Sequence, residues 1–578
     1  MRTTRFLTAF WSLTRPYWAS KQRAKGITLL VTVIALVLAM VWMEVQFNNW
    51  NRDFYNTFEQ KDQAEFFRQL GLFALLALTW IIMAVYRLYF QQMLQIEWRT
   101  WLTDHFLAGW LKDQAHYRMQ LLARAADPAV AGMDNPDQRI AEDLRMFVDF
   151  TLSLALGLLS AVVTLLSFVI ILWALSGQIT VFGTSIPGYM VWVALVYAIA
   201  GSWLTHVIGR PLIRLDFNQQ RFEADFRFGL VRLRENSEGV ALYRGEGEEL
   251  VGLRQRFASV IGNWWGLMLK RKQLGWFTSF YSQLAIIFPY IVVAPRFFSG
   301  AIPLGGFMQT ASAFNYVQSS LSWFVDVYAR LAEWKATVDR LTGFHDAIER
   351  ARAAAQAKPG IERERAVDAS GIVLDGVRLE LPDGRVLLDA ATERFAPGEA
   401  VLLMGPSGAG KSTLFRAIAG IWPFGAGRIA VPEDARMMFL PQRPYLQVGT
   451  LRELVHYPES RAFCADAEFI RTLADCGLAH LAPRLDEYQN WALELSVGEQ
   501  QRIAFCRALL RKPDWLMLDE ATSALDAAAE AALYRLLRER LPGTALISIG
   551  HRPGLAAYHD RKLDLWAAAA PALRAAAA

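Results

Sequence analysis

The sequence predicts an all-α domain of six transmembrane helices, followed by an α/β domain built around a phosphate-binding loop. Two observations predict this order. Apolar runs long enough to cross a bilayer, which takes roughly 20 residues, fall within residues 1–345. Beyond them, short apolar strands alternate with Gly-rich turns, and one strand runs directly into the pattern GPSGAGKS.

Six segments are expected to span the membrane. They are Ile27–Val45, Leu70–Phe90, Thr151–Leu175, Ile186–Ile208, Trp276–Phe298 and Gly305–Val327. The sixth carries Gln309, Asn315 and Gln318. Because amides are costly in hydrocarbon, we expect this span to line a protected or water-filled interior rather than to face lipid.

The distribution of Lys and Arg predicts the orientation. Basic residues precede the first span and fill the two long connections, 91–150 and 209–275, whereas Ser176–Ser185 carries no charge. Because positive loops stay in the cytosol, we expect the N-terminus, both long connections and the second domain there. The long connections are expected to be helical, and Phe10–Lys25 to lie along the membrane surface. A formal charge of only +5 gives no reason to expect a nucleic-acid partner.

Composition sets the domain boundaries. We expect a transmembrane domain over residues 1–345, an Ala-rich and charged linker over 346–368, a nucleotide-binding domain over 369–566 and a low-complexity tail over 567–578. The three cysteines, Cys464, Cys476 and Cys506, lie in the soluble part without metal-ligand spacing, so we expect them to be reduced and structural.

The pattern GxxxxGK[ST] indicates a loop that binds the phosphates of ATP. Its glycines let backbone N–H groups turn towards the phosphate oxygens, and the following helix adds its positive end. Lys411 is expected to reach the β and γ phosphates, and Ser412 to hold Mg²⁺. The predicted nucleotide-binding residues here are Gly405, Pro406, Ser407, Gly408, Ala409, Gly410, Lys411, Ser412 and Thr413.

A second motif is the apolar strand Trp515–Leu518, which ends in two carboxylates. Asp519 is expected to orient Mg²⁺, and Glu520 to polarise the attacking water. A buried strand with an acidic end is ordinary in isolation. Beside a phosphate-binding loop, it predicts a nucleotide hydrolase.

The most specific feature is LSVGEQQR, Leu495–Arg502. It resembles the signature sequence, usually LSGGQ, of ATP-binding-cassette (ABC) proteins. Other motifs of that family appear in the family's order. Gln442 matches the loop that senses the γ-phosphate and Mg²⁺, Asp526 matches the loop that couples two cassettes, and His551 matches the switch histidine.

This resemblance implies an ABC exporter-type fold with shared catalytic sites. In ABC proteins two cassettes dimerise head to tail, and each ATP lies between the phosphate loop of one and the signature of the other. The signature residues Ser496, Val497, Gly498 and Glu499, at the start of a helix, would therefore bind the partner's ATP. A chain with one cassette is then expected to be a homodimer, with a different half-transporter as the alternative partner.

Two positions depart from the family's pattern. Leu381 stands where an aromatic residue commonly stacks on adenine, so adenine would be held by apolar contact or by another residue. Val497 replaces the first glycine of the usual signature, whereas the serine and the second glycine remain. We expect ATP hydrolysis to survive both changes.

Several phrases narrow the resemblance. Asn135–Ile140, Glu223–Arg227 and Tyr243–Glu246 in the long connections, and Leu440–Tyr445 in the cassette, are similar to two groups. These are the SbmA/BacA-type peptide-uptake permeases with their cassette-fused relatives, and the peroxisomal fatty-acyl (subfamily D) transporters. The resemblance implies an ATP-driven transporter of a peptide, a cobalamin-like molecule or an acyl substrate. The residues of the spans distinguish neither among these substrates nor between import and export. Frequent Ala, with Arg preferred over Lys, favours a bacterial inner membrane.

One other function stays open as an alternative. In a proton-driven SbmA/BacA-type permease with a regulatory cassette, Glu44 or Asp326 would carry the proton. A soluble cassette ATPase acting on nucleic acid or the ribosome conflicts with the predicted spans.

Overall fold

The computed structural model describes residues 2–124, 136–181, 184–356, 360–367, 369–406, 408–459 and 464–564. The chain forms two compact units. The first contains Met1–Leu107 and Asn135–Phe344, and the second contains Ala108–Asp134 and His345–Ala578. The sequence predictions for Asn135, Ser407 and the tail 567–578 fall outside the described residues.

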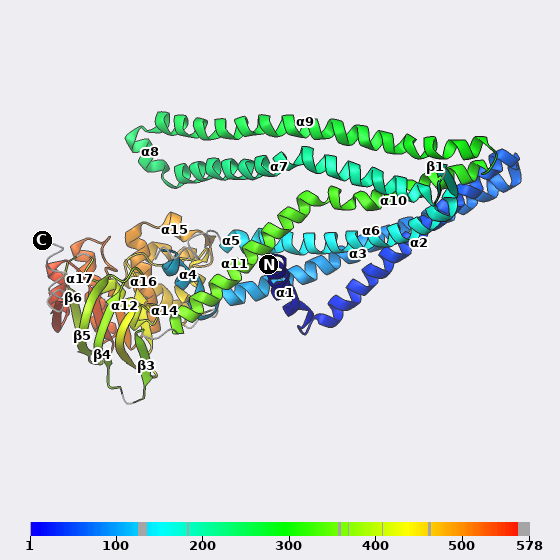
Figure 1. Ribbon diagram of the computed structural model, residues 1–578. Coiled ribbons are helices and arrows are strands. Elements are labelled where there is room, and N and C mark those ends of the chain that lie inside the picture. Colours follow the sequence, from blue (N-terminus) through cyan, green and yellow to red (C-terminus); the bar gives the residue numbers. More distant parts are fainter. Residues whose placement is uncertain are drawn as a thin grey trace. The chain divides into compact units, whose positions relative to one another are not determined.

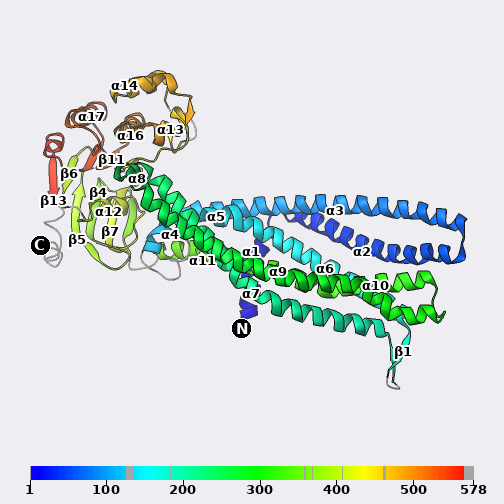
Figure 2. The ribbon, with the colours of Figure 1, turned by 90° about the horizontal axis from the view of Figure 1, so that it is seen from above.

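The first unit is built from long helices (Figure 1). They are α1 (Arg2–Trp18), α2 (Arg23–Gln60), α3 (Gln63–Leu111), α5 (Pro136–Gln138), the π-helix η2 (Arg139–Asp143), α6 (Leu144–Ser176), α7 (Tyr189–Glu235), α8 (Ser237–Tyr243), α9 (Glu246–Phe298), α10 (Leu304–Asp326) and α11 (Tyr328–Gln356). The helices α7 and α9 run side by side, and α8 joins their ends (Figures 1 and 2). The described residues of both long connections are therefore largely helical, as predicted.

Five helices of the described residues are long and apolar enough to cross a membrane, namely α2, α3, α6, α7 and α9. The predicted sixth span coincides with α10, a helix of 23 residues that does not meet this hydropathy criterion. This helix packs against α2, α6, α7 and α9. Gln309 and Thr310 are 2% and 1% exposed, whereas Asn315 and Gln318 are half-buried and line a cavity, so the three amides lie at protected positions, as predicted.

Hydrogen bonds tie α10 to α2 at this buried position. The side-chain nitrogen of Asn48 donates to the Gln309 main-chain oxygen at 3.2 Å, and the Gln309 side chain donates to Asn49 Oδ1 at 3.1 Å. Of the two carboxylates considered as proton carriers, Glu44 accepts a hydrogen bond from Thr164 at 3.3 Å, and Asp326 is the last residue of α10.

Two local features differ from the sequence prediction. Residues Ile186 and Pro187, placed in the fourth span, belong to an antiparallel hairpin of β1 (Gln178–Val181) and β2 (Thr184–Pro187), and the helix begins at Tyr189. Much of the predicted linker is regular structure. Its Ala, Arg and Glu residues favour helix, so α11 continues to Gln356, and Glu362–Ala366 forms strand β3.

The second unit contains two main sheets. The first has five parallel strands in the order β13-β6-β12-β11-β8, and the second has the order β3-β7-β4-β5. The strands are β3, β4 (Ile372–Glu380), β5 (Val386–Phe395), β6 (Ala400–Met404), β7 (Gly425–Pro432), β8 (Met437–Leu440), β11 (Trp515–Asp519), β12 (Ala545–Ile549) and β13 (Arg561–Asp564). Two short strands, β9 (Gly449–Thr450) and β10 (Tyr488–Gln489), pair with each other and with neither main sheet.

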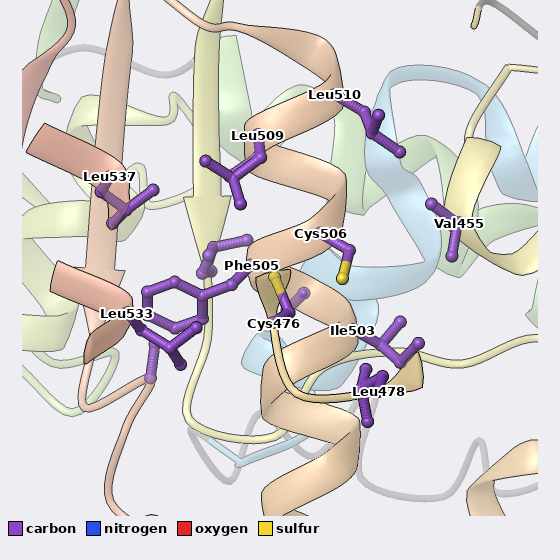
Figure 3. Packing of buried hydrophobic residues seen from close by; sticks show 14 of the residues in the cluster. Val455, Cys476, Leu478, Ile503, Phe505, Cys506, Leu509, Leu510, Leu533 and Leu537 are labelled. Atoms are coloured by element: carbon purple, nitrogen blue, oxygen red, sulfur yellow. The ribbon is translucent and has the colours of Figure 1, made fainter. Parts of the chain in front are cut away.

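The α-helices of this unit are α4 (Ala115–Arg124), α12 (Lys411–Ile418), α13 (Leu451–His456), α14 (Asp466–Asp475), α15 (Trp491–Glu494), α16 (Val497–Arg511) and α17 (Ala527–Arg540). Short 3₁₀ turns lie at Lys112–Gln114, Ala479–Arg484 and Pro553–Tyr558. The helix α16 is central. Its Phe505 points towards Leu533 and Leu537 of α17, while Cys506 faces the opposite side, where Cys476 and Val455 lie (Figure 3). All three cysteines are free thiols, as predicted.

The helix α4 lies in the first long connection but packs with the second unit. Its Leu121 is 5% exposed and belongs to the hydrophobic core around the two sheets, with Tyr117 partly buried beside it. The segment Asn135–Ile140, one of those that narrow the family resemblance, lies further along the chain, and its described part forms α5 and the start of η2 in the first unit. In this connection, α4 makes the contact with the cassette core.

A buried carboxylate joins α6 to α11 in the first unit. Asp143, the last residue of η2, is 1% exposed. Arg139 donates to it at 2.7 Å, and Arg340 of α11 donates to both its oxygens at 2.9 and 2.7 Å. Because a buried charge is tolerated only with such partners, this cluster fixes the start of α6 against the helix that leads to the cassette.

Replacing Asp143 by Ala leaves the guanidinium groups of Arg340 and Arg139 without their carboxylate partner. Those side chains are partly exposed, 19% for Arg139 and 35% for Arg340, so we expect a loss of about 1.5–3 kcal/mol of stability, read as a lower midpoint of thermal unfolding in detergent. The control is Asp149→Asn on α6, since Asp149 lies 4.0 Å from Arg330 and both are about half exposed. That change should cost about 0–1 kcal/mol. Equal midpoints for the two variants would contradict a stabilising role for Asp143.

Candidate nucleotide-binding site

The phosphate-loop motif occupies the turn between strand β6 and helix α12. Residues Ala400–Leu403 of β6 are buried in the parallel sheet. The loop leaves it through glycines with positive φ, 135° at Gly405, 83° at Gly408 and 91° at Gly410. A Cβ at Gly410 would lie 3.1 Å from the Cβ of Leu387, so backbone conformation and space both require glycine there. The turn directs the N-terminus of α12 towards the loop, where its N–H groups favour an anion.

Lys411 is the first residue of α12 and is 6% exposed. Its amino group donates to the main-chain oxygens of Gly405 at 2.6 Å and Pro406 at 2.9 Å, so the side chain folds back over the loop. Burial lowers the pKa of Lys411, and the nearby carboxylates of Glu520 and Asp519 oppose that shift. The loop thus combines a held ammonium group with a helix N-terminus, a combination suited to phosphate.

Ser412 and Asp519 meet across the sheet. The Ser412 hydroxyl donates to Asp519 Oδ1 at 2.8 Å. Burial raises the pKa of Asp519, and the hydrogen bond from Ser412 lowers it. A hydroxyl and a carboxylate oxygen are the hard donors that Mg²⁺ takes beside phosphate oxygens, so these two residues fit the predicted metal role.

Two further predicted residues, Gln442 and His551, contact the carboxylate of Glu520. Gln442, beyond the end of β8, donates its side-chain N–H to Glu520 Oε2 at 3.1 Å. His551, beyond the end of β12, places Nε2 at 3.3 Å from Glu520 Oε1. Glu520 itself has a φ of 49°, an unusual conformation for a residue with a side chain. Because β8, β11 and β12 are parallel neighbours, their carboxyl ends bring the three side chains to one edge.

The signature motif forms a helix start. Ser496 is the N-cap of α16 and makes a capping box with Glu499, in which each side chain bonds to the other's backbone N–H. The Val497 side chain is 50% exposed. Gly498 lies against the loop before α17, where an added Cβ would be 3.4 Å from the Ala524 oxygen. Asp526 caps α17 by accepting from the Ala529 N–H at 2.7 Å.

Leu381 lies in the turn between β4 and β5, where its N–H donates to the Arg385 oxygen at 2.8 Å. Its side chain is partly buried against the core around the two sheets. The structure therefore gives Leu381 a packing role.

Sequence reasoning missed two buried polar residues next to these motifs. Gln501 on α16 is 1% exposed, and Glu530 on α17 is 6% exposed. The only signal in the sequence is a polar residue on the apolar face of a helix. The Glu530 carboxylate accepts from Thr522 at 2.5 Å and lies 3.5 Å from Arg552, next to His551.

Comparisons with known proteins give the family of the chain. A family model described as ABC transporter transmembrane region 2 matches residues 13–298, and one described as ABC transporter matches residues 388–523. The inner membrane ABC transporter ATP-binding protein YddA of Escherichia coli is 34% identical over 97% of this chain and 98% of its own length. The chain belongs to the ABC transporter family.

Further relatives support the predicted subgroup. The ABC transporter D family member 2, chloroplastic, of Arabidopsis thaliana is 33% identical over 96% of this ABC transporter chain and 85% of its own length. The human lysosomal cobalamin transporter ABCD4 is 26% identical, over 95% of this chain and 92% of its own. The predicted likeness to subfamily D is therefore confirmed.

A solved structure confirms the predicted fold class. The structure of a bacterial Atm1-family ABC exporter with ATP bound aligns with a TM-score of 0.71, covering 94% of each chain at 19% identity. The chain is thus an ABC half-transporter with an exporter-type fold, in which one helical membrane domain precedes one ATP-hydrolysing domain that is coupled to transport.

Lys411→Ala tests the phosphate loop. Hydrogen bonds to a charged group contribute about 1.5–3 kcal/mol each, so we expect ATP to bind about 10- to 100-fold more weakly. Binding of a fluorescent ATP analogue to purified protein measures the change. Lys562→Ala, an exposed lysine on the edge strand β13, serves as the control and should keep the wild-type affinity. Equal affinity in both variants would exclude the assigned role of Lys411.

Proposed function

We propose that two copies of this chain form an ATP-driven transporter in a bacterial inner membrane, with the cassettes in the cytosol. The observation that carries the proposal is the division of the motifs within one chain. Lys411, Ser412 and Asp519 gather at one edge of the parallel sheet, whereas Ser496 bonds within its own helix start. A second copy supplies the Ser496 helix start to the phosphate loop of the first, and receives the same in return.

The location in the inner membrane rests on two arguments. The curated name of the bacterial relative YddA places that protein in the inner membrane. The Lys and Arg residues of this chain gather before the first span and in the long connections, the side that remains in the cytosol.

Each residue of the site has a role in hydrolysis. The loop Gly405–Gly410 and Lys411 bind the β and γ phosphates, and the N-terminus of α16 in the partner binds the γ-phosphate from the other side. Ser412, Asp519 and Gln442 are the residues that would hold Mg²⁺, which neutralises phosphate charge when bound. Glu520 accepts a proton from the attacking water. Gln442 and His551 hold its two oxygens in place, at 3.1 and 3.3 Å.

The membrane domain offers a site for the transported molecule. A cavity of about 370 Å³ lies between α9 and α10. Its lining residues with polar groups are Ser282, Ser312, Ser319, Asn315, Gln318, Tyr281 and Tyr316. Ala285 and Ile286 add apolar surface, and among the described residues that line it, none carries a charge. Polar groups at membrane depth are expensive unless they face a cavity or a ligand, so this wall suits a ligand that combines uncharged hydrogen-bonding groups with apolar parts.

The wall is fixed by hydrogen bonds. Tyr197 and Tyr281 each donate to the other's main-chain oxygen, at 2.6 and 3.2 Å, and their rings stack at 4.5 Å. Gln318 donates to the Tyr281 hydroxyl at 3.3 Å. The chemistry favours a substrate rich in amide groups, such as a peptide or a cobalamin-like molecule, over a bare acyl chain.

Glu520→Gln tests coupling of hydrolysis to transport. The variant keeps the hydrogen-bonding shape but lacks the basic carboxylate, so we expect ATP to be retained in the dimer and transport in vesicles to stop. Glu539→Gln, an exposed residue of α17, should behave as wild type. Transport by the Glu520 variant driven by a pH gradient alone would contradict the proposal.

Asn315→Leu tests the cavity. The change removes an amide from the wall at nearly constant volume, so stimulation of ATPase activity by peptides or by cobalamin should need about 10-fold more ligand, as expected for one lost hydrogen bond of about 1 kcal/mol or more. Ile287→Leu, on an exposed position of α9, is the control. Equal stimulation of wild type and variant by every ligand class, or stimulation by acyl chains alone, would refute the assignment.

A further inference from the structure

The buried residue Gln501 has contacts that the proposed hydrolysis does not yet use. It lies in the second turn of α16, five residues after the N-cap Ser496, and its side chain is 1% exposed. The residues that follow it on α16, from Ile503 to Leu510, are all buried, and apart from Arg507 they are apolar or thiol-bearing. A neutral amide in such surroundings is costly unless its donors and acceptor are satisfied.

The Gln501 amide bonds to two separate loops. Its nitrogen donates to the Gln442 main-chain oxygen at 3.0 Å and to the Ser523 hydroxyl at 3.1 Å. Its oxygen accepts from the Ala524 N–H at 3.1 Å. One side chain therefore joins the signature helix, the loop after β8 and the loop before α17.

The loop after β8 leads directly to the catalytic carboxylate. The main chain of Gln442 is held by Gln501, and its side chain donates to Glu520. The loop before α17 is also held on its other side, because Thr522 donates to Glu530, which lies 3.5 Å from Arg552. Gln501 is thus connected to Glu520 through two hydrogen bonds, by way of Gln442. The loop before α17, which Gln501 also contacts, is linked through Glu530 to Arg552, the residue next to His551.

These contacts join parts that serve different ATP molecules in the proposed dimer, and the inference rests on that dimer. Ser496 and Gly498 of one chain face the partner's ATP, whereas Gln442 and Glu520 of the same chain face its own. We propose that Gln501 is the positioning residue that couples the two ATP sites. When α16 shifts as it closes on the partner's γ-phosphate, the Gln501 amide moves Gln442 with it and changes how Glu520 is held.

The geometry makes such transmission direct. Hydrogen bonds of 3.0–3.1 Å weaken steeply on small displacements, so the three segments either move together or break bonds to a buried amide. The start of α16 also contacts the loop before α17 at a second point, Gly498. An added Cβ at Gly498 would lie 3.2 Å from Leu525 and 3.4 Å from the Ala524 oxygen. The helix and this loop cannot move independently by much.

The experiment measures the ATPase rate of the reconstituted full-length protein as a function of ATP concentration. Gln501→Leu keeps the volume and removes all three hydrogen bonds. Gln501→Glu keeps an acceptor for the Ala524 N–H and loses both donors. Gln500→Leu is the matched control, since Gln500 donates to the Ala492 and Leu495 oxygens, both within the segment that leads into α16.

We expect a wild-type Hill coefficient above 1, with an upper limit of about 2 for two sites. It should fall to about 1 in both Gln501 variants and stay at the wild-type value in Gln500→Leu. A purely structural role would instead lower the thermal midpoint and leave the Hill coefficient unchanged. If Gln501→Leu does not fold, the Hill coefficient of Gln501→Glu decides whether the coupling holds.

A wild-type coefficient of 1, or an unchanged coefficient in Gln501→Glu, overturns the coupling and leaves the homodimer proposal intact. Full ATPase activity in a single subunit would overturn the homodimer itself, and the two failures are therefore distinguishable.

Discussion

The register of three parallel strands is the constraint on which the catalytic edge depends. The strands β8, β11 and β12 are neighbours with matched partners, such as Leu518 opposite both Leu440 and Ser548. Each strand is followed within two residues by a functional residue, so the shared edge brings Gln442, Glu520 and His551 together. A one-residue slip of β11 would turn Glu520 away from both partners. The buried apolar faces of these strands hold that register, because a slip would exchange Leu516 and Leu518, which pack in the core on one face of the sheet, with Trp515 and Met517, which pack in the core on the other.

The rest of the chain serves this edge in two ways. In the second unit, α16 carries the signature serine at one end and is buried along most of its length, so its position is tied to the core. In the first unit, long helices are held together by polar contacts at protected positions, such as Asp143 with Arg340 and Asn48 with Gln309. Buried pairs of this kind define a specific arrangement and stabilise the rigid helices through which nucleotide binding can act on the membrane domain.

Short motifs with fixed local geometry made much of this site predictable. The loop from Gly405 to Ser412 requires positive φ values that glycine supplies, so its sequence specifies its shape. The pairing of Ser412 with Asp519 also follows, since Ser412 lies in the first turn of the helix after β6 and Asp519 ends β11, so both lie at the carboxyl edge of the same parallel sheet. Among the described residues, five of the six predicted spans coincide with helices that are long and apolar enough to cross a membrane, because length and hydropathy are local properties of the sequence.

What the sequence did not reveal depends on contacts between distant segments. Leu121 packs into the cassette core against residues far along the chain. The helix α11 continues into the predicted linker because Ala, Arg and Glu favour helix. The hairpin before Tyr189 is closed by pairing between Gln178–Val181 and Thr184–Pro187. Gln501 was overlooked because its partners, Gln442 and Ser523, come from loops on either side of it in sequence. A buried amide has no pattern of its own until its partners are placed.

The shared catalytic site is the central claim, and complementation in mixed dimers tests it most directly. Lys411→Ala disables the phosphate loop, and Ser496→Arg disables the signature. Each variant alone should hydrolyse almost no ATP, because both sites of its dimer are defective. Co-expression of the two variants, with differently tagged chains purified in sequence, should restore ATPase activity, since one site of each mixed dimer then contains both intact halves. A mixed dimer as inactive as its parents, or full activity in a homodimer of the Ser496→Arg variant, would contradict the account.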